Sequence, residues 1–413
     1  MSPHQQTHVI VGAGLAGAKA AETLREEGFE GRIVMIAAEP ERPYERPPLS
    51  KEVLRGEAAR ETAFVHDASF YDERDIELVT GTAATAIDPG RFRVTLAGGR
   101  ELAYDRLLLA TGAEPRRLPV PGADLDGVRM LRTLADADAL REQLRPGARV
   151  VVVGAGWIGS EVAASARMLG AEVTVIDRAK VPLEHVLGER IGAVYRDLHR
   201  EHGVEYLPQT GVGAFEGDGR VSAVRTTDGR LLPCDLAVVG IGVAPRTELA
   251  EAAGLAVEDG VVCDERLGTT APAVYAAGDV ASAWHPFYGR HLRVEHWANA
   301  LHQGPAAAQA MLGRPVVYDR IPYFYSDQYD VGMEYSGLAG ADDELVVRGD
   351  LERREFVAFW LRDDRVVAGM NVNVWDVNQH VQALIRSRAV VDRAALADPG
   401  TPLDALVPAT AAS

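Results

Sequence analysis

Apolar residues recur in one order at three places along the chain: a short apolar run, a glycine turn, and then residues at helical spacing. These segments run from His8 to Gly28, from Arg149 to Gly170 and from Pro272 to Ala283. A second apolar run follows each of the first two, at Ile33–Glu39 and Glu172–Asp177. Strand, helix and strand in this order form a βαβ unit, which implies a parallel sheet covered by helices. We therefore predict an α/β fold with two Rossmann-like units.

Joints rich in glycine and proline at 112–122 and 240–246 bracket the second βαβ unit. Such joints are typical of domain boundaries. We predict a first domain over 1–114 and 244–322, with a second domain, 115–243, inserted into it.

The pattern changes from about Tyr323. Two strand-like runs, 355–361 and 365–370, flank Asp363-Asp364, which suits a hairpin turn. Apolar residues within 377–387 share one helical face. We predict a third, α+β domain over 323–413, and disorder in its last six residues.

Composition excludes several classes of function. Lysine and arginine number 43 against 60 acidic residues, a net charge of −17, which disfavours nucleic acid and anionic membrane as partners. No apolar run reaches the ~18 residues of a membrane span. Cys234 and Cys263 form no CxxC motif and are predicted to be buried hydrophobic residues. We expect no metal site and a cytoplasmic location.

The first glycine turn, Gly12-Ala-Gly14-Leu-Ala-Gly17, fits GxGxxG between a strand and a helix. The first glycine permits the tight turn, the second lets a pyrophosphate approach, and the third lets helix and strand pack closely. Glu39 follows near the end of the next strand, where it can accept hydrogen bonds from ribose hydroxyls. The pattern predicts a dinucleotide site.

Gly278-Asp279 in the third segment indicates which dinucleotide binds there. An acid at the end of a strand, just before a helix, can hydrogen-bond the polyol chain of a flavin while the helix N-terminus faces phosphate. We predict FAD. The alternative is that Asp279 only caps a helix.

The second glycine turn, with Gly154, Gly156 and Gly159, repeats the fingerprint. Asp177 ends the following strand, and an acid there favours the free 2′-hydroxyl of NADH. Arg178 and Lys180 come next and could bind the 2′-phosphate of NADPH. We expect NADH rather than NADPH.

The chain resembles the ferredoxin-reductase branch of the two-dinucleotide flavoprotein reductases, which includes the reductases of putidaredoxin, rubredoxin and aromatic-dioxygenase ferredoxins and, more distantly, apoptosis-inducing factor. The two glycine turns carry the likeness, together with the sequences PYERPPLSK (43–51), LLLATGAEPR (107–116), LRT (131–133), YAAGD (275–279), VEHWANA (294–300) and YFYSDQYD (323–330). Many relatives have an acid just before the Glu39 position, where this chain has Ala38. The resemblance therefore leaves Glu39 to hold the ribose alone.

The resemblance also implies the site residues. For FAD and the active site they are Gly12, Gly14, Leu15, Ala16, Gly17, Glu39, Arg46, Lys51, Ala84, Ala110, Thr111, Gly112, Arg132, Gly278, Asp279, Glu295, His296 and Trp297. For NADH they are Gly154, Gly156, Ile158, Gly159, Glu161, Asp177, Arg178 and Gly242. Lys51, Glu161 and Tyr325 are the expected catalytic residues, with Tyr325 over the flavin–nicotinamide site.

Related disulfide reductases carry a cysteine pair near position 50, whereas the first cysteine of this chain is Cys234. A thiol beside the flavin therefore cannot relay electrons. A proline-stiffened segment stands there instead, and its prolines fix Arg46 and Lys51 with little loss of entropy. We expect Lys51, held by Glu161, to be a cation that stabilises the reduced flavin.

The residues predict an NADH-dependent flavoprotein, and the resemblance implies that it passes single electrons to a small iron–sulfur ferredoxin serving an oxygenase. Two alternatives remain open: an NADH oxidase or quinone reductase, and an NADH-sensing protein like apoptosis-inducing factor. A homodimer also remains open.

Overall fold

The chain passes five times between two structural units in the computed structural model, which describes residues 6–407. The first unit comprises the chain up to Arg46, Arg60–Glu114 and Val243–Arg320. The second comprises Pro47–Ala59, Pro115–Gly242 and the chain from Ile321 onward. The division into three domains stays a prediction. The tail expected to be disordered, 408–413, lies outside the described residues.

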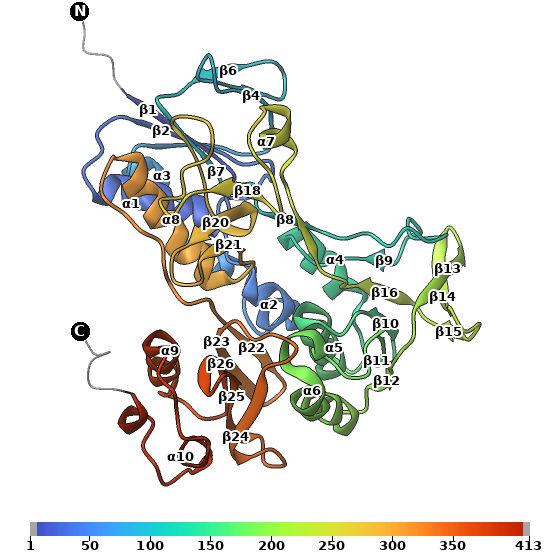
Figure 1. Cartoon of the computed structure of the whole chain (residues 1–413). Coiled ribbons are helices and arrows are strands. Elements are labelled where there is room, and N and C mark those ends of the chain that lie inside the picture. The colour runs from blue at the N-terminus through green and yellow to red at the C-terminus, as the bar shows by residue number, and fades with distance from the viewer. Residues whose placement is uncertain (1–5, 408–413) are drawn as a thin grey trace, which may run out of the picture. The chain divides into compact units, whose positions relative to one another are not determined.

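A five-stranded parallel sheet forms the centre of the first unit (Figure 1). Its central strand pairs in register with both neighbours, so that Val9 lies opposite Val34 and Leu107. In spatial order the strands are β19 (Val274–Ala276), β7 (Arg106–Leu109), β1 (Thr7–Val11), β2 (Arg32–Ile36) and β3 (Ile76–Val79). Four of the five residues of β1 are buried, as expected for a parallel strand covered on both faces.

Two helices, α1 (Leu15–Glu26) and α8 (Trp297–Met311), pack against each other in this unit (Figure 1). Gly304 permits their contact, because a Cβ atom there would lie 2.3 Å from the Ala16 carbonyl oxygen. The remaining helices and turns of the unit are η2 (Arg60–Ala63), α3 (Phe70–Glu73), α7 (Glu248–Ala252) and η3 (Gly278–Val280).

Smaller sheets complete the first unit. They are β4 (Ala84–Asp88) with β5 (Arg93–Leu96) and β6 (Glu101–Ala103); β18 (Val261–Cys263) with β20 (Ala281–His285) and β21 (Arg290–Arg293); and β8 (Ala113–Pro115) with β17 (Val243–Pro245). For the third predicted strand–turn–helix segment, 272–283, the predicted helix is wrong. A single 3-10 turn follows Gly278, and β20 begins at Ala281 where we expected a helix.

The second unit contains another five-stranded parallel sheet, built on the second glycine turn. Its strands, in spatial order, are β12 (Glu205–Leu207), β11 (Glu172–Ile176), β10 (Arg149–Val153), β16 (Leu236–Val239) and β9 (Val128–Arg129). A three-stranded antiparallel sheet accompanies it: β13 (Val212–Asp218), β14 (Arg220–Thr226) and β15 (Leu231–Pro233). The helices of this part are η1 (Pro47–Ser50), α2 (Glu52–Arg55), α4 (Leu134–Gln143), α5 (Trp157–Met168) and α6 (Glu184–Glu201).

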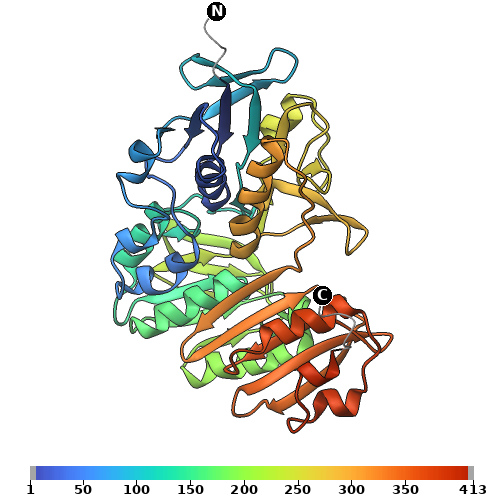
Figure 2. The same ribbon diagram turned by 90° about the vertical axis from the view of Figure 1, so that its left-hand side faces the viewer.

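The C-terminal part forms a five-stranded antiparallel sheet, seen in orange to red in Figure 2. The strands, in spatial order, are β22 (Tyr323–Gln328), β23 (Val331–Gly337), β26 (Arg365–Val372), β25 (Glu355–Arg362) and β24 (Glu344–Asp350). The predicted hairpin is confirmed: β25 and β26 pair, and Asp363 and Asp364 both take positive φ between them. The helices are α9 (Asn378–Ser387), α10 (Arg393–Ala397) and η4 (Asp404–Leu406).

The two faces of this antiparallel sheet pack against different helices. Phe356, Ala358 and Trp360 pack with the apolar stripe of α6, whose buried members are Leu187, Ile191, Tyr195 and Leu198. The opposite face meets α9, where Val381 lies against Gly369. The α6 helix is therefore fixed against β22 and its neighbours, and this positions the polar residues described below.

Candidate functional site

The first glycine turn has the stereochemistry of a phosphate loop. Gly12 has φ +113°, and a Cβ atom there would lie 2.0 Å from the Ala110 carbonyl oxygen. A Cβ atom at Gly17 would lie 2.1 Å from the Gly12 oxygen, whereas one at Gly14 would meet no atom within 4 Å. The outer glycines are thus required for packing, while Gly14 borders open space at the N-terminus of α1, whose first N–H groups have no helical partner. This cradle fits the pyrophosphate of a dinucleotide.

The second glycine turn repeats that arrangement. Cβ atoms at Gly154 and Gly159 would lie 2.4 Å and 2.0 Å from backbone oxygens, and one at Gly156 would meet nothing within 4 Å. Asp177 secures the turn, because its carboxylate accepts hydrogen bonds from the N–H groups of Ala155 (2.5 Å) and Ala179 (2.7 Å). Each carboxylate oxygen has a second lone pair, which leaves Asp177 able to accept a ribose hydroxyl as well.

Two side chains of the first unit contact the Glu39 carboxylate. The Tyr44 hydroxyl donates a hydrogen bond to its carboxylate, and the Arg46 guanidinium lies 3.4 Å from the other oxygen. Burial opposes the charge of Arg46, but Tyr44, Glu39 and Asp279 outweigh it and raise the pKa of Arg46. Glu39, Arg46 and Asp279 therefore form one charged cluster in the first unit, and Tyr44 is a member that the sequence did not indicate.

The other predicted FAD residues of the first unit lie at the ends of its elements. Ala110, Thr111 and Gly112 follow β7, and the Thr111 hydroxyl donates to the Arg246 carbonyl at 2.8 Å. The backbone N–H of Gly278 donates to the Gln303 side chain at 2.8 Å. Ala84 begins β4, and Glu295, His296 and Trp297 lead into α8. Burial lowers the pKa of His296 to about 4, so its imidazole is neutral at pH 7.

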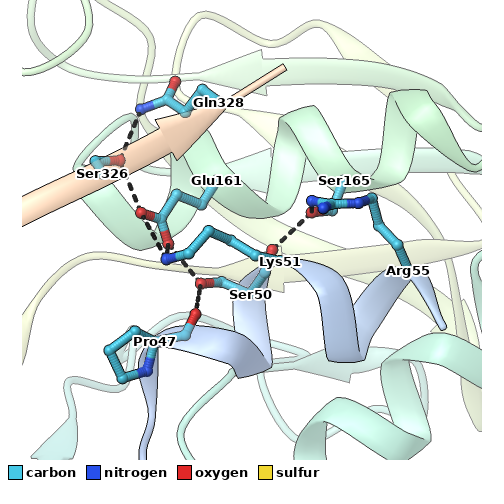
Figure 3. A network of polar contacts seen from close by, with 8 residues as sticks. All are labelled: Pro47, Ser50, Lys51, Arg55, Glu161, Ser165, Ser326 and Gln328. Carbon is cyan, nitrogen blue, oxygen red and sulfur yellow. Dashed lines mark hydrogen bonds and ion pairs between the residues drawn. The ribbon is translucent and has the colours of Figure 1, made fainter. Parts of the chain in front are cut away.

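A buried ion pair lies in the second unit (Figure 3). The Lys51 ammonium lies 3.4 Å from both carboxylate oxygens of Glu161, and the two residues are 6% and 4% exposed. Two hydroxyls also donate to that carboxylate: Ser50 at 2.5 Å and Ser326 at 2.7 Å. An ion pair removed from water is maintained only when its remaining hydrogen-bonding capacity is met, and the two serines supply that here.

Two further contacts anchor the segment that carries Lys51 (Figure 3). The Ser165 hydroxyl donates to the Ser50 carbonyl at 2.6 Å, and Arg55 donates to Ser165 at 3.4 Å. Both Glu161 and Ser165 belong to α5, one helical turn apart, so a single helix face holds the segment at two points. The prolines Pro47 and Pro48 restrict the backbone of η1 before it.

Tyr325 lies beside the ion pair. The Lys51 ammonium is 5.3 Å from the centre of the Tyr325 ring, within the range of a cation–π contact. The three expected catalytic residues, Lys51, Glu161 and Tyr325, therefore lie together.

Some predicted residues are brought together and others lie in separate units. Of the residues implied for FAD, Lys51 and Arg132 belong to the second unit and the rest to the first. Arg132 precedes α4, where its backbone N–H donates to Asp136 at 3.1 Å. All residues implied for NADH belong to the second unit. Arg178 is exposed there, and Gly242, at φ +94°, is the last residue before the chain re-enters the first unit.

The sequence did not indicate four polar residues of the site, Ser50, Ser165, Ser326 and Gln328. Of these, Ser50, Ser326 and Gln328 lie inside the two motifs PYERPPLSK and YFYSDQYD.

Residues 6–304 match the pyridine nucleotide-disulphide oxidoreductase family, and residues 323–407 match the reductase C-terminal family. The chain belongs to the pyridine nucleotide-disulphide oxidoreductases. The likeness of this oxidoreductase to individual relatives extends over nearly the whole chain. Putidaredoxin reductase of Pseudomonas putida is 41% identical over 411 residues, covering 98% of this chain and 97% of the relative. The ferredoxin–NAD⁺ reductase component of the anthranilate 1,2-dioxygenase system of Burkholderia cepacia is 43% identical over 395 residues, covering 95% and 97%.

Solved structures give the same result. The oxidoreductase matches the reductase in the covalent putidaredoxin reductase–putidaredoxin complex with a TM-score of 0.95 and 40% identity, covering 99% of each chain. An NAD-dependent persulfide reductase from A. fulgidus matches at a TM-score of 0.87 with 24% identity, which speaks for the fold alone. The predicted α/β fold, the family resemblance and the two cofactors are confirmed: this oxidoreductase uses FAD and NADH.

Neither cysteine of this oxidoreductase is reactive. Both are free and buried, and burial raises the pKa of Cys234 to about 11 and that of Cys263 to about 12. At neutral pH both thiols are protonated and cannot act as nucleophiles. Among residues 6–407, no three His, Cys, Asp or Glu side chains gather as a metal site, and none of the helices described could span a membrane.

Proposed function

We propose that the protein is an NADH-dependent ferredoxin reductase that supplies electrons to an oxygenase through a small [2Fe–2S] ferredoxin. The net reaction takes one NADH and two oxidised ferredoxins to NAD⁺, two reduced ferredoxins and one proton. Relatives named as ferredoxin–NAD⁺ reductase components of dioxygenase systems, and one named as a putidaredoxin reductase, support the acceptor class. A ferredoxin is a one-electron acceptor, so it fits an enzyme that converts two-electron to one-electron chemistry.

One observation carries the proposal. The chain has two glycine turns whose geometry fits a pyrophosphate and a buried lysine–glutamate pair, and both of its cysteines are buried. When bound, FAD accepts hydride from NADH and releases electrons singly. The chain's own residues bind the two dinucleotides and orient them. Gly14 and Gly156 leave room for the two pyrophosphates, Glu39 and Asp177 offer carboxylates to ribose hydroxyls, and Asp279 offers one to the flavin polyol chain.

Lys51 is proposed as a fixed positive charge that favours the reduced form of the flavin. Glu161 and its two serine donors hold the ammonium in place, and Tyr325 offers a ring face to the same cation. The remaining residues implied by the resemblance, Arg132, Glu295, His296 and Trp297 among them, are proposed as cofactor contacts.

The proposal extends to the location of the protein in the cell. The protein works in the cytoplasm, which two unpaired buried thiols support, because secreted proteins favour disulfides. The sequence left a homodimer open, and light scattering at micromolar concentration tests it.

Stopped-flow spectroscopy tests the electron route. We expect NADH to bleach the flavin absorbance quickly under anaerobic conditions. Reoxidation by a [2Fe–2S] ferredoxin should then be far faster than reoxidation by air-saturated buffer. Fast reoxidation by air or quinone would identify an oxidase or quinone reductase instead. A long-lived complex with NAD⁺ would identify a sensor, and a colourless protein that takes up no flavin would contradict the whole proposal.

A further inference from the structure

The polar network of Figure 3 continues beyond Gln328 into helix α6. The Nε2 of His199 lies 3.0 Å from the Gln328 side-chain oxygen, and its Nδ1 lies 3.2 Å from the Tyr329 hydroxyl. Gln328 in turn donates to the Ser326 hydroxyl at 3.4 Å, and Ser326 donates to Glu161. His199, Gln328 and Ser326 are each 2% exposed or less. A buried chain of side chains therefore connects α6 with the Lys51–Glu161 pair.

The charge of Glu161 fixes the direction of every link. A carboxylate only accepts hydrogen bonds, so the Ser326 hydroxyl must donate its single proton to Glu161. Ser326 must therefore accept the hydrogen bond that it shares with Gln328. The amide nitrogen of Gln328 then faces Ser326, and its oxygen faces His199. His199 must carry its proton on Nε2 to donate to that oxygen.

The far end of the chain agrees with this assignment. A neutral imidazole protonated on Nε2 has a bare Nδ1, which accepts the proton of the Tyr329 hydroxyl. Burial lowers the pKa of His199 to about 4; the hydrogen bond that His199 donates to Gln328 opposes that shift and the nearby His202 reinforces it. His199 is therefore neutral at pH 7, with one tautomer selected by its two partners.

The chain orients groups and does not conduct protons. An amide holds no proton that it can exchange by simple acid–base steps, so Gln328 interrupts any relay between His199 and Ser326. Every member donates toward Glu161, so the chain has one orientation. What it can do is fix the amide, and through the amide fix the Ser326 hydroxyl against one carboxylate oxygen.

We propose that His199 and Gln328 are positioning residues for the Lys51–Glu161 pair. Through Ser326 they hold the Glu161 carboxylate in the orientation that pairs with the Lys51 ammonium and keeps that cation fixed. This inference rests on the proposed role of Lys51 and assigns part of that role to α6, a helix that contributes no residue to the predicted cofactor sites.

Two amide substitutions of one histidine test the proposal. His199→Gln places an amide nitrogen near the former Nε2 and can still donate to Gln328. His199→Asn is one methylene shorter and leaves the Gln328 oxygen without that donor. His202→Asn is the matched control, because His202 is at the same end of α6 and stacks on Tyr329 at 3.7 Å, while its ring bonds to the Leu198 carbonyl and not to His199, Gln328 or Ser326.

The holoenzyme of each variant is examined by stopped flow, potentiometry and ¹⁵N NMR. We expect His199→Asn to lower the limiting rate of flavin reduction about tenfold, since a hydrogen bond that orients a charged group is worth about that factor. The dissociation constant for NADH should stay within about twofold, while His199→Gln and His202→Asn should keep the wild-type rate. The flavin midpoint potential should fall in His199→Asn alone. Wild-type spectra should show His199 protonated on Nε2, and the Gln328 amide resonances should shift in His199→Asn.

Several results would overturn the proposal. A His199→Asn enzyme with the wild-type rate and potential would do so, as would a His199→Gln enzyme as slow as His199→Asn. The variant Lys51→Met separates this proposal from the one on which it rests. If Lys51→Met slows flavin reduction and His199→Asn does not, only the positioning role fails. If Lys51→Met changes neither rate nor potential, the role of the ion pair fails and the positioning role with it.

Discussion

The Lys51 ammonium lies 3.4 Å from both carboxylate oxygens of Glu161, although 110 positions separate the two residues in the chain. Both side chains are almost fully buried, so each charge depends on the other for compensation. The pair is also the point at which η1, α5 and β22 meet through Ser50 and Ser326. Stability and redox chemistry are therefore coupled at one site, and the coupling can be measured.

Substitution of either partner should shift the flavin potential in opposite directions. Lys51→Met removes the positive charge and should lower the midpoint potential, by about 30 mV for every 1.4 kcal/mol of lost stabilisation of the two-electron couple. Glu161→Gln removes the opposing negative charge but keeps a side-chain oxygen that can accept from Lys51, so it should raise the midpoint potential. Potentiometric titration of both variants checks the sign, and shifts in the same direction would contradict the proposed role of Lys51.

The same pair should dominate local stability. Lys51→Met leaves the Glu161 carboxylate buried without its cation, which should lower the free energy of unfolding by about 3–5 kcal/mol. The double variant Lys51→Met, Glu161→Leu removes both charges and should recover most of that loss. Urea unfolding of the three proteins measures it; equal losses in the single and double variants would show that the pair is not energetically coupled.

The glycine turns allow binding and folding to be separated. Gly14→Ala and Gly156→Ala put a methyl group into open space at ordinary φ angles of −80° and −75°. Both should leave the free energy of unfolding within about 0.5 kcal/mol of wild type. Gly14→Ala should lose FAD, measured by the absorbance of the purified protein, and Gly156→Ala should keep FAD but bind NADH weakly.

Their matched control is Gly17→Ala, whose Cβ atom would lie 2.1 Å from the Gly12 oxygen. This variant should be destabilised by about 1–3 kcal/mol or more, because the backbone must move to admit the methyl group. A Gly14→Ala protein with a full complement of FAD would refute the assignment of the first turn.

Coenzyme preference should depend on Asp177. Asp177→Asn removes the charge that repels a 2′-phosphate and also weakens the bonds to the Ala155 and Ala179 N–H groups. The ratio of kcat/KM for NADH to that for NADPH should fall about tenfold. Lys180→Ala is the companion variant: it should weaken NADPH use and leave NADH use unchanged, because Lys180 is exposed and is not among the residues implied for NADH. A ratio unaltered by Asp177→Asn would remove Asp177 from coenzyme selection.

Buried His199 should make the protein sensitive to acid. Its folded pKa of about 4 lies below the unfolded value of 6.5, so below pH 6.5 the unfolded chain binds a proton that the folded chain does not. Stability from this group is complete above pH 6.5 and is lost as the pH falls toward 4, at about 1.4 kcal/mol per unit of pKa difference. His8 and His296 behave alike, so the difference between wild type and His199→Gln isolates His199. Urea unfolding at pH 7.5 and 4.5 should show a smaller loss in the variant.

Local features of the fold could be predicted from the sequence because they depend on neighbours along the chain. The spacing of Gly12, Gly14 and Gly17 determines a turn whose φ values and close contacts few other residues allow. The apolar run 356–361, followed by Asp363-Asp364 and a second apolar run, predicts a hairpin. The helix predicted for the third segment was wrong because the prediction used local residues only. Asp279 has the local features of a helix start, but the residues after it form β20, which pairs with β18 and β21.

The sequence by itself thus determined the two glycine turns, the hairpin of the C-terminal part and the absence of cysteine from 43–51, each of which is set by residues close together in the chain. Only the tertiary structure decided which distant side chains meet. Tyr44 and Arg46 share Glu39, Asp177 bonds to its own glycine turn, and Ser326, Gln328 and His199 line up behind Glu161. Burial is the physical reason, since only a folded interior excludes the water that would otherwise satisfy these groups one by one.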